Sequence, residues 1–229
     1  MHRLNSNAFQ EFEDRLVRCR RCPRLRAWCQ EVAQVKRRAY LDWEYWGKPV
    51  PSFGDPRARL LIVGLAPGAH GANRTGRMFT GDRSGDYLYR VLHATGFASR
   101  PYSVSRDDGQ RLTGAWITAS AHCAPPGNKP TPQELRNCRV WLHTELDLLR
   151  DVRVVVALGK IAFDNYLAVQ RERGATTGAL AFGHNRRFDL TPVLISSYHP
   201  SQQNTSTGRL TERMLIDVFR RAARIAQIV

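Results

Sequence analysis

The stretch RLLIVGLAPGAHG, residues 59–71, decides the fold class of this chain. Its first half, Arg59–Leu65, is an apolar run without alternation, which is typical of a strand that is covered on both faces. Its second half is rich in glycine and alanine and predicts that the strand ends there in a turn. Three later runs have the same character: Gly114–Ser120 (GAWITAS), Val152–Leu158 (VRVVVAL) and Pro192–Ser197 (PVLISS).

Helical patterns lie between and around these strands. Thr131 and Glu134 form a capping-box pair around a proline at the first helical position, and Ser84 is placed to cap another helix. Apolar residues at helical spacing follow in two segments: Leu135, Cys138, Leu142, Leu146 and Leu149, then Leu210, Met214, Val218, Ala222 and Ile225. The basic region up to Ala39 also has a helical pattern. This alternation predicts a three-layer α/β/α sandwich around a four-stranded, mainly parallel sheet, with residues 1–229 forming one domain.

Three unusual loops follow three of the predicted strands. They read GLAPGAHG, AHCAPPGNKP and SYHPSQQNT, and all are rich in glycine, proline or small polar residues. Open parallel sheets bind ligands beyond the carboxyl ends of their strands. We therefore expect the functional site where these loops converge.

The charge of the chain favours a polyanionic partner. Its 229 residues include 35 Lys and Arg against 20 Asp and Glu, a formal net charge of +15. Nucleic acid fits this excess better than a membrane, because there is no basic amphipathic anchor and no apolar run of membrane-spanning length. A solvated basic surface is the plainer alternative. The N-terminus has no apolar core typical of a signal peptide, which predicts a cytoplasmic protein.

The cysteines indicate a metal centre. Cys19 and Cys22 form a C-x₂-C pair, and Cys123 and Cys138 form a second pair separated by fourteen residues. An odd count of five in a cytoplasmic chain argues against structural disulfides. Spacing alone leaves structural zinc, a [4Fe–4S] cluster and unconnected buried thiols open. Cys29 fits neither pair.

Several loop residues are candidates for binding a base or its flanking phosphates. Phe79 lies among polar residues, where its ring is suited to stack on an extruded base, while Arg74 and Arg77 are suited to phosphate contacts. The alternative places Phe79 in the core and makes Asp82 a turn or cap residue. His199 follows a strand and is either structural or catalytic.

Together these residues resemble the uracil-DNA glycosylase superfamily, and most narrowly its type B, or family 5, iron–sulfur branch. The resemblance is carried by GLAPG, FTGD, CAPPGNKPTP, SYHPS-x-x-N and the four cysteines, and covers about residues 15–225. It implies a DNA repair enzyme that removes uracil from DNA, leaving an abasic site. It also implies a [4Fe–4S] cluster held by Cys19, Cys22, Cys123 and Cys138.

The resemblance assigns roles to further residues. His199 would stabilise the departing uracil anion, Asn128 would hold the attacking water, and Asp82 would assist it. The base would lie between Phe79 and these implied contacts: Gly64, Leu65, Ala66, Pro67, Gly68, Ala119 and Ser120. DNA would be contacted by Arg74, Arg77, Ser201, Gln202, Gln203, Asn204 and Arg209, with the segment from His199 to Arg209 filling the gap left by the base.

Two departures from the family pattern bear on specificity. Met78 stands where relatives commonly have proline, and Ala119 stands where other branches have an asparagine that reads uracil. Losing that amide predicts weaker discrimination, so hypoxanthine and other deaminated bases are expected substrates. A monomer is expected. The alternatives are a non-catalytic iron–sulfur or zinc module that binds nucleic acid, which the missing acidic residue in GLAPG favours, and a nucleotide-binding α/β protein.

Overall fold

A six-stranded sheet forms the centre of the molecule in the computed structural model, which describes residues 2–227 and the side chains from Asn7 onward. The strand order is β1-β3-β2-β4-β6-β5. The four inner strands are parallel: β3 (Ala115–Ala119), β2 (Leu60–Gly64), β4 (Val154–Leu158) and β6 (Val193–Ser197). The predicted α/β sandwich and its four parallel strands are confirmed, with strand ends that differ by at most two residues.

The prediction of only four strands was incomplete. Two short edge strands, β1 (Phe53–Gly54) and β5 (Arg186–Phe188), pair antiparallel with β3 and β6. They have two and three residues and carry no apolar run. Edge strands of this length are defined by their pairing partners, so neither leaves a periodic pattern in the sequence.

Helices cover both faces of the sheet. Consecutive strand residues point to opposite faces, and the side chains on both faces are apolar. On β2, Leu60 and Ile62 pack with α4 (Arg83–Ala94) and α8 (Glu212–Ala226). Leu61 and Val63 pack on the other face with α5 (Pro132–Leu148) and α6 (Lys160–Glu172). Double coverage explains why the strands are apolar throughout.

Helix starts follow local capping chemistry. The capping box at Thr131 is confirmed, with Thr131 Oγ1 accepting from Glu134 N at 3.2 Å and Glu134 Oε2 accepting from Thr131 N at 2.7 Å. The prediction for α4 was wrong: Asp82 caps it, and Ser84 lies inside its first turn. The C-terminal helix begins at Glu212 behind its cap Thr211, so Leu210 precedes it.

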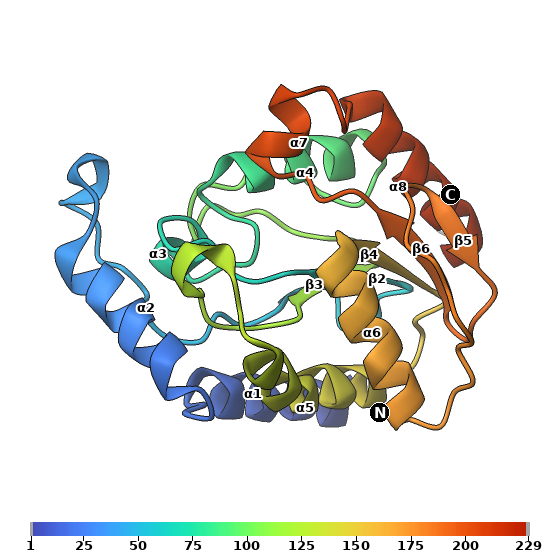
Figure 1. Ribbon diagram of the computed structural model, residues 1–229, viewed down its shortest axis with the longest axis horizontal. Helices are drawn as coiled ribbons and strands as arrows, with labels where there is room; N and C mark the ends of the chain where they lie inside the picture. The colour runs from blue at the N-terminus through green and yellow to red at the C-terminus, as the bar shows by residue number, and fades with distance from the viewer. Residues whose placement is uncertain (1, 228–229) are drawn as a thin grey trace.

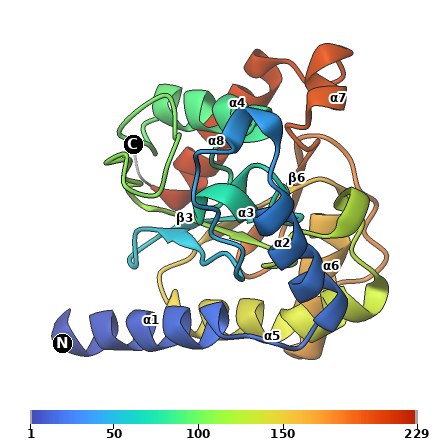
Figure 2. The ribbon, with the colours of Figure 1, turned by 90° about the vertical axis from the view of Figure 1, so that its left-hand side faces the viewer.

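The N-terminal segment forms two helices, α1 (His2–Val17) and α2 (Pro23–Val35), separated by a break that contains Cys19 and Cys22. Helix α1 lies alongside α5, whereas α2 runs up the side of the molecule and ends in a projecting turn, η1 (Arg38–Tyr40) (Figures 1 and 2). Short helices α3 (Ala72–Thr75), η2 (Pro126–Asn128) and α7 (Gln202–Ser206) lie in the loops beyond the strands. Between residues 2 and 227, no helix is long and apolar enough to cross a membrane.

Candidate active site

At the carboxyl ends of β2 and β3, hydrogen bonds hold together the two loops that follow these strands. Gly64 pairs with Ala119 in register, and the carbonyl of Gly64 accepts hydrogen bonds from Ser120 N at 2.9 Å and Ser120 Oγ at 3.1 Å. Ala121 N donates to Leu65 O at 3.0 Å. Ala119 and Ser120 are 3% and 2% exposed. These bonds fix the first residues of the GLAPG loop against the end of β3.

Phe79 and His199 come together over the end of β2. Their rings are stacked, with centroids 6.0 Å apart and an interplanar angle of 30°. A Cβ on Gly64 would lie 2.7 Å from Phe79 Cε2, so the ring lies directly over that glycine. Phe79 adopts a left-handed backbone conformation, with φ of 52°, which is strained for an aromatic residue. The sequence left open whether Phe79 belongs to the core or to the site. The structure places its ring half-buried against His199.

His199 is held as a neutral imidazole. Burial lowers its pKa to about 4, because removing the ring from water disfavours the charged form. Its Cβ lies close to Gly159, where an added Cβ would be 3.2 Å away, and its carbonyl accepts from Asn204 Nδ2 at 2.9 Å. A neutral ring in this position can donate one hydrogen bond without bringing a charge.

Asp82 faces the GLAPG loop while it caps α4. Its Oδ1 accepts from Gly85 N at 3.0 Å. Its Oδ2 lies against Gly68 and Gly71, and a Cβ on Gly68 would be 2.8 Å from that oxygen. Burial is the largest influence on this carboxyl and raises its pKa. Asp82 is therefore both a cap residue, as the plainer alternative predicted, and a neighbour of the predicted base-binding loop.

Asn128 lies on the loop after β3 and is exposed. It ends η2 in a left-handed conformation with φ of 57°, which asparagine tolerates better than most residues. Its backbone N–H donates to Pro125 O at 3.1 Å. Within residues 2–227 no hydrogen bond joins its side chain to Phe79, Asp82 or His199. The amide is therefore available to a ligand, and its role in holding water stays a prediction.

The four paired cysteines line one cavity between the N-terminal break, α5 and the loop after β3. Cys19, Cys22, Cys123 and Cys138 all contribute to its wall, together with Arg21 and Arg26. Two sulfurs accept hydrogen bonds: Cys138 from His122 N at 3.4 Å, and Cys22 from Asn137 Nδ2 at 3.7 Å. All cysteines are free thiols. In the part of the chain that the structure describes, no three His, Cys, Asp or Glu side chains are grouped closely enough to hold a single metal ion.

Cys29 lies beside this cavity without lining it. It is fully buried, packs with Leu25 and Cys123, and donates from its Sγ to Ala124 O at 3.6 Å. Sequence spacing separated it from the other four, and its place in the structure gives it a packing role.

Comparison with known proteins identifies the family. A family model described as the uracil DNA glycosylase superfamily matches residues 51–223. A relative named type-5 uracil-DNA glycosylase, from Thermus thermophilus, is 52% identical over 219 residues, which are 95% of this chain and 98% of the relative. The chain belongs to the uracil-DNA glycosylase superfamily.

Further relatives place the chain in the type-5 branch of that superfamily. Proteins of the same name from Pyrobaculum aerophilum and Mycobacterium leprae are 49% and 48% identical over 216 and 224 residues. These matches cover 94% and 97% of this chain, and 92% and 98% of the two relatives. A type-4 uracil-DNA glycosylase from Archaeoglobus fulgidus is only 29% identical, over 66% of this chain and 70% of its own length. The resemblance inferred from the motifs is confirmed.

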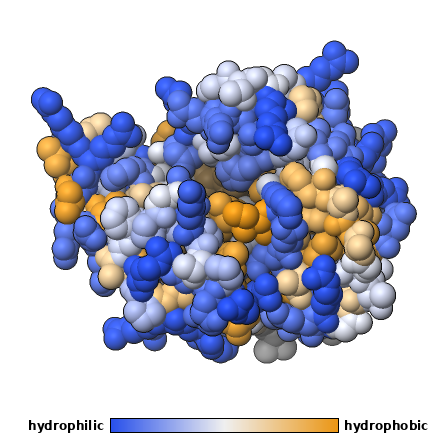
Figure 3. Space-filling model, viewed as in Figure 1, coloured by the Kyte–Doolittle hydropathy of each residue, from blue (hydrophilic) through white to orange (hydrophobic). Residues whose placement is uncertain are grey.

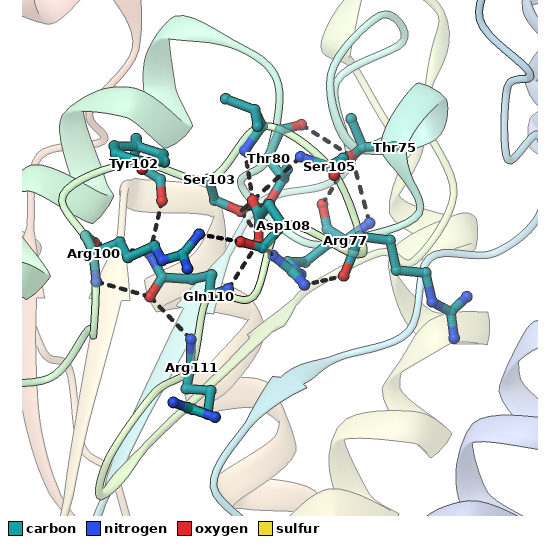
Figure 4. A network of polar contacts seen from close by, with 12 residues as sticks. Thr75, Arg77, Thr80, Arg100, Tyr102, Ser103, Ser105, Asp108, Gln110 and Arg111 are labelled. Carbon is teal, nitrogen blue, oxygen red and sulfur yellow. Dashed lines mark hydrogen bonds and ion pairs between the residues drawn. The ribbon is translucent and has the colours of Figure 1, made fainter.

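Arg77 lies inside the protein and not on the surface that was predicted to contact DNA. It is 5% exposed and pairs with Asp108, with Arg77 NH1 2.5 Å from Asp108 Oδ1. Its guanidinium also donates to Ser103 Oγ at 3.0 Å (Figure 4). Burial acts to raise the pKa of Asp108, but hydrogen bonds from backbone N–H groups and Arg77 outweigh it and lower that pKa to about 2. This network holds the loop that carries Phe79, because Ser103 Oγ also bonds Thr80 Oγ1 at 2.8 Å.

Arg74 is also buried, at 4% exposure, and connects two loops of the candidate site. Its Nε donates to His70 O at 2.8 Å and its NH2 to Gly81 O at 3.0 Å. The guanidinium lies 3.9 Å from the ring centroid of Tyr40 and 4.1 Å from that of Trp43. In this structure neither Arg74 nor Arg77 is placed to meet a phosphate.

The aromatic residues that hold Arg74 were missed by sequence reasoning. Tyr40 and Trp43 belong to the segment AYLDWEYW, which also supplies Tyr45, whose hydroxyl lies 3.1 Å from His70 Nδ1. The density of aromatic residues beside the basic KRR run was the available signal. It was missed because nothing local connects it to a loop thirty residues later.

The segment after His199 presents polar side chains to solvent. Ser201 caps α7 by accepting from Asn204 N at 3.4 Å, and Gln202, Gln203 and Arg209 are exposed. The guanidinium of Arg209 lies 4.7 Å from the ring centroid of Tyr198. In the same view as Figure 1, apolar residues lie in a hollow near the centre of the face, surrounded by hydrophilic side chains (Figure 3).

Proposed function

We propose that this protein hydrolyses the N-glycosidic bond of uracil in DNA and leaves an abasic site. The observation that carries the proposal is the arrangement of Phe79 and neutral His199 over Gly64, at the strand ends where this fold binds ligands. The relatives with about 50% sequence identity, which are named type-5 uracil-DNA glycosylases, support the same reaction. The non-catalytic alternative is not favoured.

The chemistry follows from where charge develops. Breaking the bond leaves positive charge on the sugar and negative charge on the departing base. His199, as a neutral donor, stabilises a uracil carbonyl oxygen as it becomes negative. Phe79 stacks on the base, and backbone groups of Leu65, Ala66, Pro67 and Gly68 hold its edge.

The attacking water must be positioned by a residue outside the GLAPG loop. The side chain of Ala66 has no polar atom, whereas the exposed side-chain amide of Asn128 can accept and donate a hydrogen bond. Asp82, whose Oδ2 faces Gly68, adds negative potential close to the developing positive charge of the sugar. We assign water positioning to Asn128 and electrostatic support to Asp82.

Substrate range and DNA contact follow from the residues at the strand ends and in α7. The small side chain of Ala119 supplies no amide to read uracil, which supports excision of hypoxanthine and other deaminated bases. Ser120 uses its hydroxyl on Gly64 O, so its contribution is to fix the pocket. Ser201, Gln202, Gln203, Asn204 and Arg209 form the proposed DNA surface. Arg74 and Arg77 are left out of it because both are buried.

The cysteine cavity fits a [4Fe–4S] cluster ligated by Cys19, Cys22, Cys123 and Cys138. Four cysteines line the same cavity, two of their sulfurs already accept N–H donors, and Arg21 and Arg26 line it too and would offset a negative cluster. Burial raises the pKa of Cys22 and Cys138, so thiolates there need the compensating charge of bound iron. When bound, the cluster would cross-link the N-terminal break to α5 and the loop after β3. A single domain, a monomer and a cytoplasmic location stay predictions.

The proposal is tested by single-turnover excision on an end-labelled duplex with one central uracil, followed by alkaline cleavage. We expect scission at uracil and at hypoxanthine, and none in undamaged DNA. His199→Ala and Asn128→Ala should each reduce the rate at least about tenfold, or about 1.4 kcal/mol of transition-state stabilisation. Tight binding without scission of any damaged base would overturn the proposal, and full rates in both variants would overturn the assigned roles.

A further inference from the structure

Phe79 is held in a backbone conformation that an aromatic residue rarely adopts. Its φ of 52° lies in the left-handed region, and its carbonyl lies so close to α4 that a Cβ on Gly85 would be 1.8 Å away. Strained conformations of this kind persist only where the surrounding structure fixes them in several ways. The support of this backbone therefore decides whether the ring lies over Gly64 and beside His199.

Hydrogen bonds fix the peptide groups on both sides of Phe79. The carbonyl of Met78 accepts from the hydroxyl of Tyr89 at 3.3 Å. The carbonyl of Thr80 accepts from Thr75 Oγ1 at 3.1 Å. The side chain of Thr80 adds a third restraint, because its buried hydroxyl is bonded to a second loop. The strained residue thus lies between two anchored neighbours.

Ser103 connects the hydroxyl of Thr80 to a buried ion pair. Ser103 Oγ lies 2.8 Å from Thr80 Oγ1, accepts from Arg77 NH1 at 3.0 Å and donates to Asp108 Oδ2 at 3.1 Å. Asp108 is ionised at neutral pH and can only accept hydrogen bonds, so it takes the proton of the Ser103 hydroxyl. The lone pairs of Ser103 then face Arg77 and Thr80. The carboxylate charge therefore orients the bond that reaches Thr80.

The loop between α4 and β3 is folded around the carboxylate of Asp108 (Figure 4). Asp108 Oδ2 accepts from the backbone N–H groups of Val104 at 2.7 Å and Ser105 at 3.2 Å, and Oδ1 accepts from Gln110 N at 2.9 Å. Its side chain is 5% exposed. A carboxylate enclosed in this way does not reach DNA, so any effect that it has on the reaction must pass through its neighbours.

We propose that Asp108 is a positioning residue for base excision, which acts through Ser103 to hold Phe79 in its strained conformation. The inference rests on the proposed function, in which the ring of Phe79 stacks on the extruded base. Removing the negative charge frees the Ser103 hydroxyl to turn and loosens the loop that carries Thr80. Phe79 then relaxes out of the left-handed region, and its ring leaves the position over Gly64.

The test measures single-turnover excision of uracil from a duplex by Asp108→Asn, which keeps the shape of the side chain and removes its charge. At saturating enzyme we expect a rate at least about fivefold lower, with the half-saturating enzyme concentration within about twofold of wild type. In a Phe79→Ala background the same substitution should change the rate by less than about twofold, because it acts through the missing ring. An equal loss in both backgrounds would overturn the proposal.

Two further variants separate positioning from stability. Ser103→Ala removes the connection to Thr80 but keeps the ion pair, so it should slow excision even if Asp108→Asn does not fold. Leu167→Ala opens a cavity in α6, on the opposite face of the sheet. It should lower the melting temperature by at least about 4 °C without slowing excision below that temperature. Full excision by Ser103→Ala, or equal slowing by Leu167→Ala, would overturn the proposal.

A crystal structure of the free variant tests the same connection without DNA. In Asp108→Asn, or in Ser103→Ala if the first variant does not fold, we expect Phe79 to have a negative φ and its ring to be displaced from Gly64. Phe79 unmoved in the variant would overturn the proposal whatever the excision rate. A wild-type protein that excises no uracil would sink the proposed function alone, since the structural comparison does not depend on activity.

Discussion

Gly64 is the residue on which the Phe79 ring depends. Because an added Cβ would lie 2.7 and 2.9 Å from two ring carbons, Gly64→Ala must displace the ring. We expect a loss of about 1–3 kcal/mol in the free energy of unfolding, as for overpacked interiors, and an excision rate at least about tenfold lower. Denaturant unfolding and single-turnover kinetics measure the two effects.

A second variant separates the strain from the lost stacking. In Gly64→Ala/Phe79→Ala the clash is gone, so the stability cost of the alanine at residue 64 should largely disappear. The excision rate should stay low because the stacking ring is missing. Recovery of excision in the double variant would mean that Phe79 does not contact the base.

His199 makes a pH prediction at the same scale. Since burial lowers its pKa to about 4, the ring stays neutral as the pH falls through the ordinary histidine range. The ratio of the wild-type rate to the His199→Ala rate should therefore be constant from about pH 8 to about pH 5.5 and change only closer to pH 4. An inflection of that ratio near about pH 6.5 would show a histidine that titrates normally and refute the neutral donor.

At the scale of the helices, Asp82 has two roles that substitutions can separate: it caps α4, and its carboxylate faces the GLAPG loop. Asp82→Ala removes the cap of α4 and should cost about 1 kcal/mol of stability. Asp82→Asn keeps an acceptor oxygen, so the cap should survive within a few tenths of a kcal/mol, while the charge near Gly68 is lost. We expect Asp82→Asn to retain its melting temperature and to excise uracil at least about tenfold more slowly.

Thr211→Ala is the control for that experiment, because Thr211 caps α8 by accepting from Met214 N. Its stability should fall like that of Asp82→Ala, with no change in excision. Full excision by Asp82→Asn would leave Asp82 as a cap residue only.

At the scale of the whole molecule, the cysteine cavity ties the N-terminal segment to the sheet. If the cavity holds the proposed cluster, Cys138→Ser should abolish the brown colour expected of that cluster and lower the melting temperature by at least about 5 °C, because the proposed cross-link between α5 and the N-terminal break would be lost. Cys29→Ala is the matched control: its sulfur lies outside the cavity wall, so the chromophore should be retained. Equal loss of colour in both variants would require Cys29 as a ligand, and a colourless wild type without iron would refute the cluster.

The sequence by itself determined the parallel sheet, the order of its loops, the Thr131 capping box and the family. Each of these depends on local pattern: an apolar run, a turn, a cap or a motif lies within a few neighbouring residues. The cysteine grouping was also readable, since a C-x₂-C pair is local, although the sharing of one cavity by Cys19 and Cys138 required the fold.

Only the tertiary structure showed which residues are buried or paired through partners that lie far away in the sequence. Arg77 was expected at DNA but is paired with Asp108, thirty-one residues further along the chain, and Arg74 is enclosed by Tyr40 and Trp43 from the N-terminal segment. The edge strands β1 and β5 likewise exist through their partners. Burial and charge pairing are properties of neighbours in space, and for these residues the neighbours are distant in sequence.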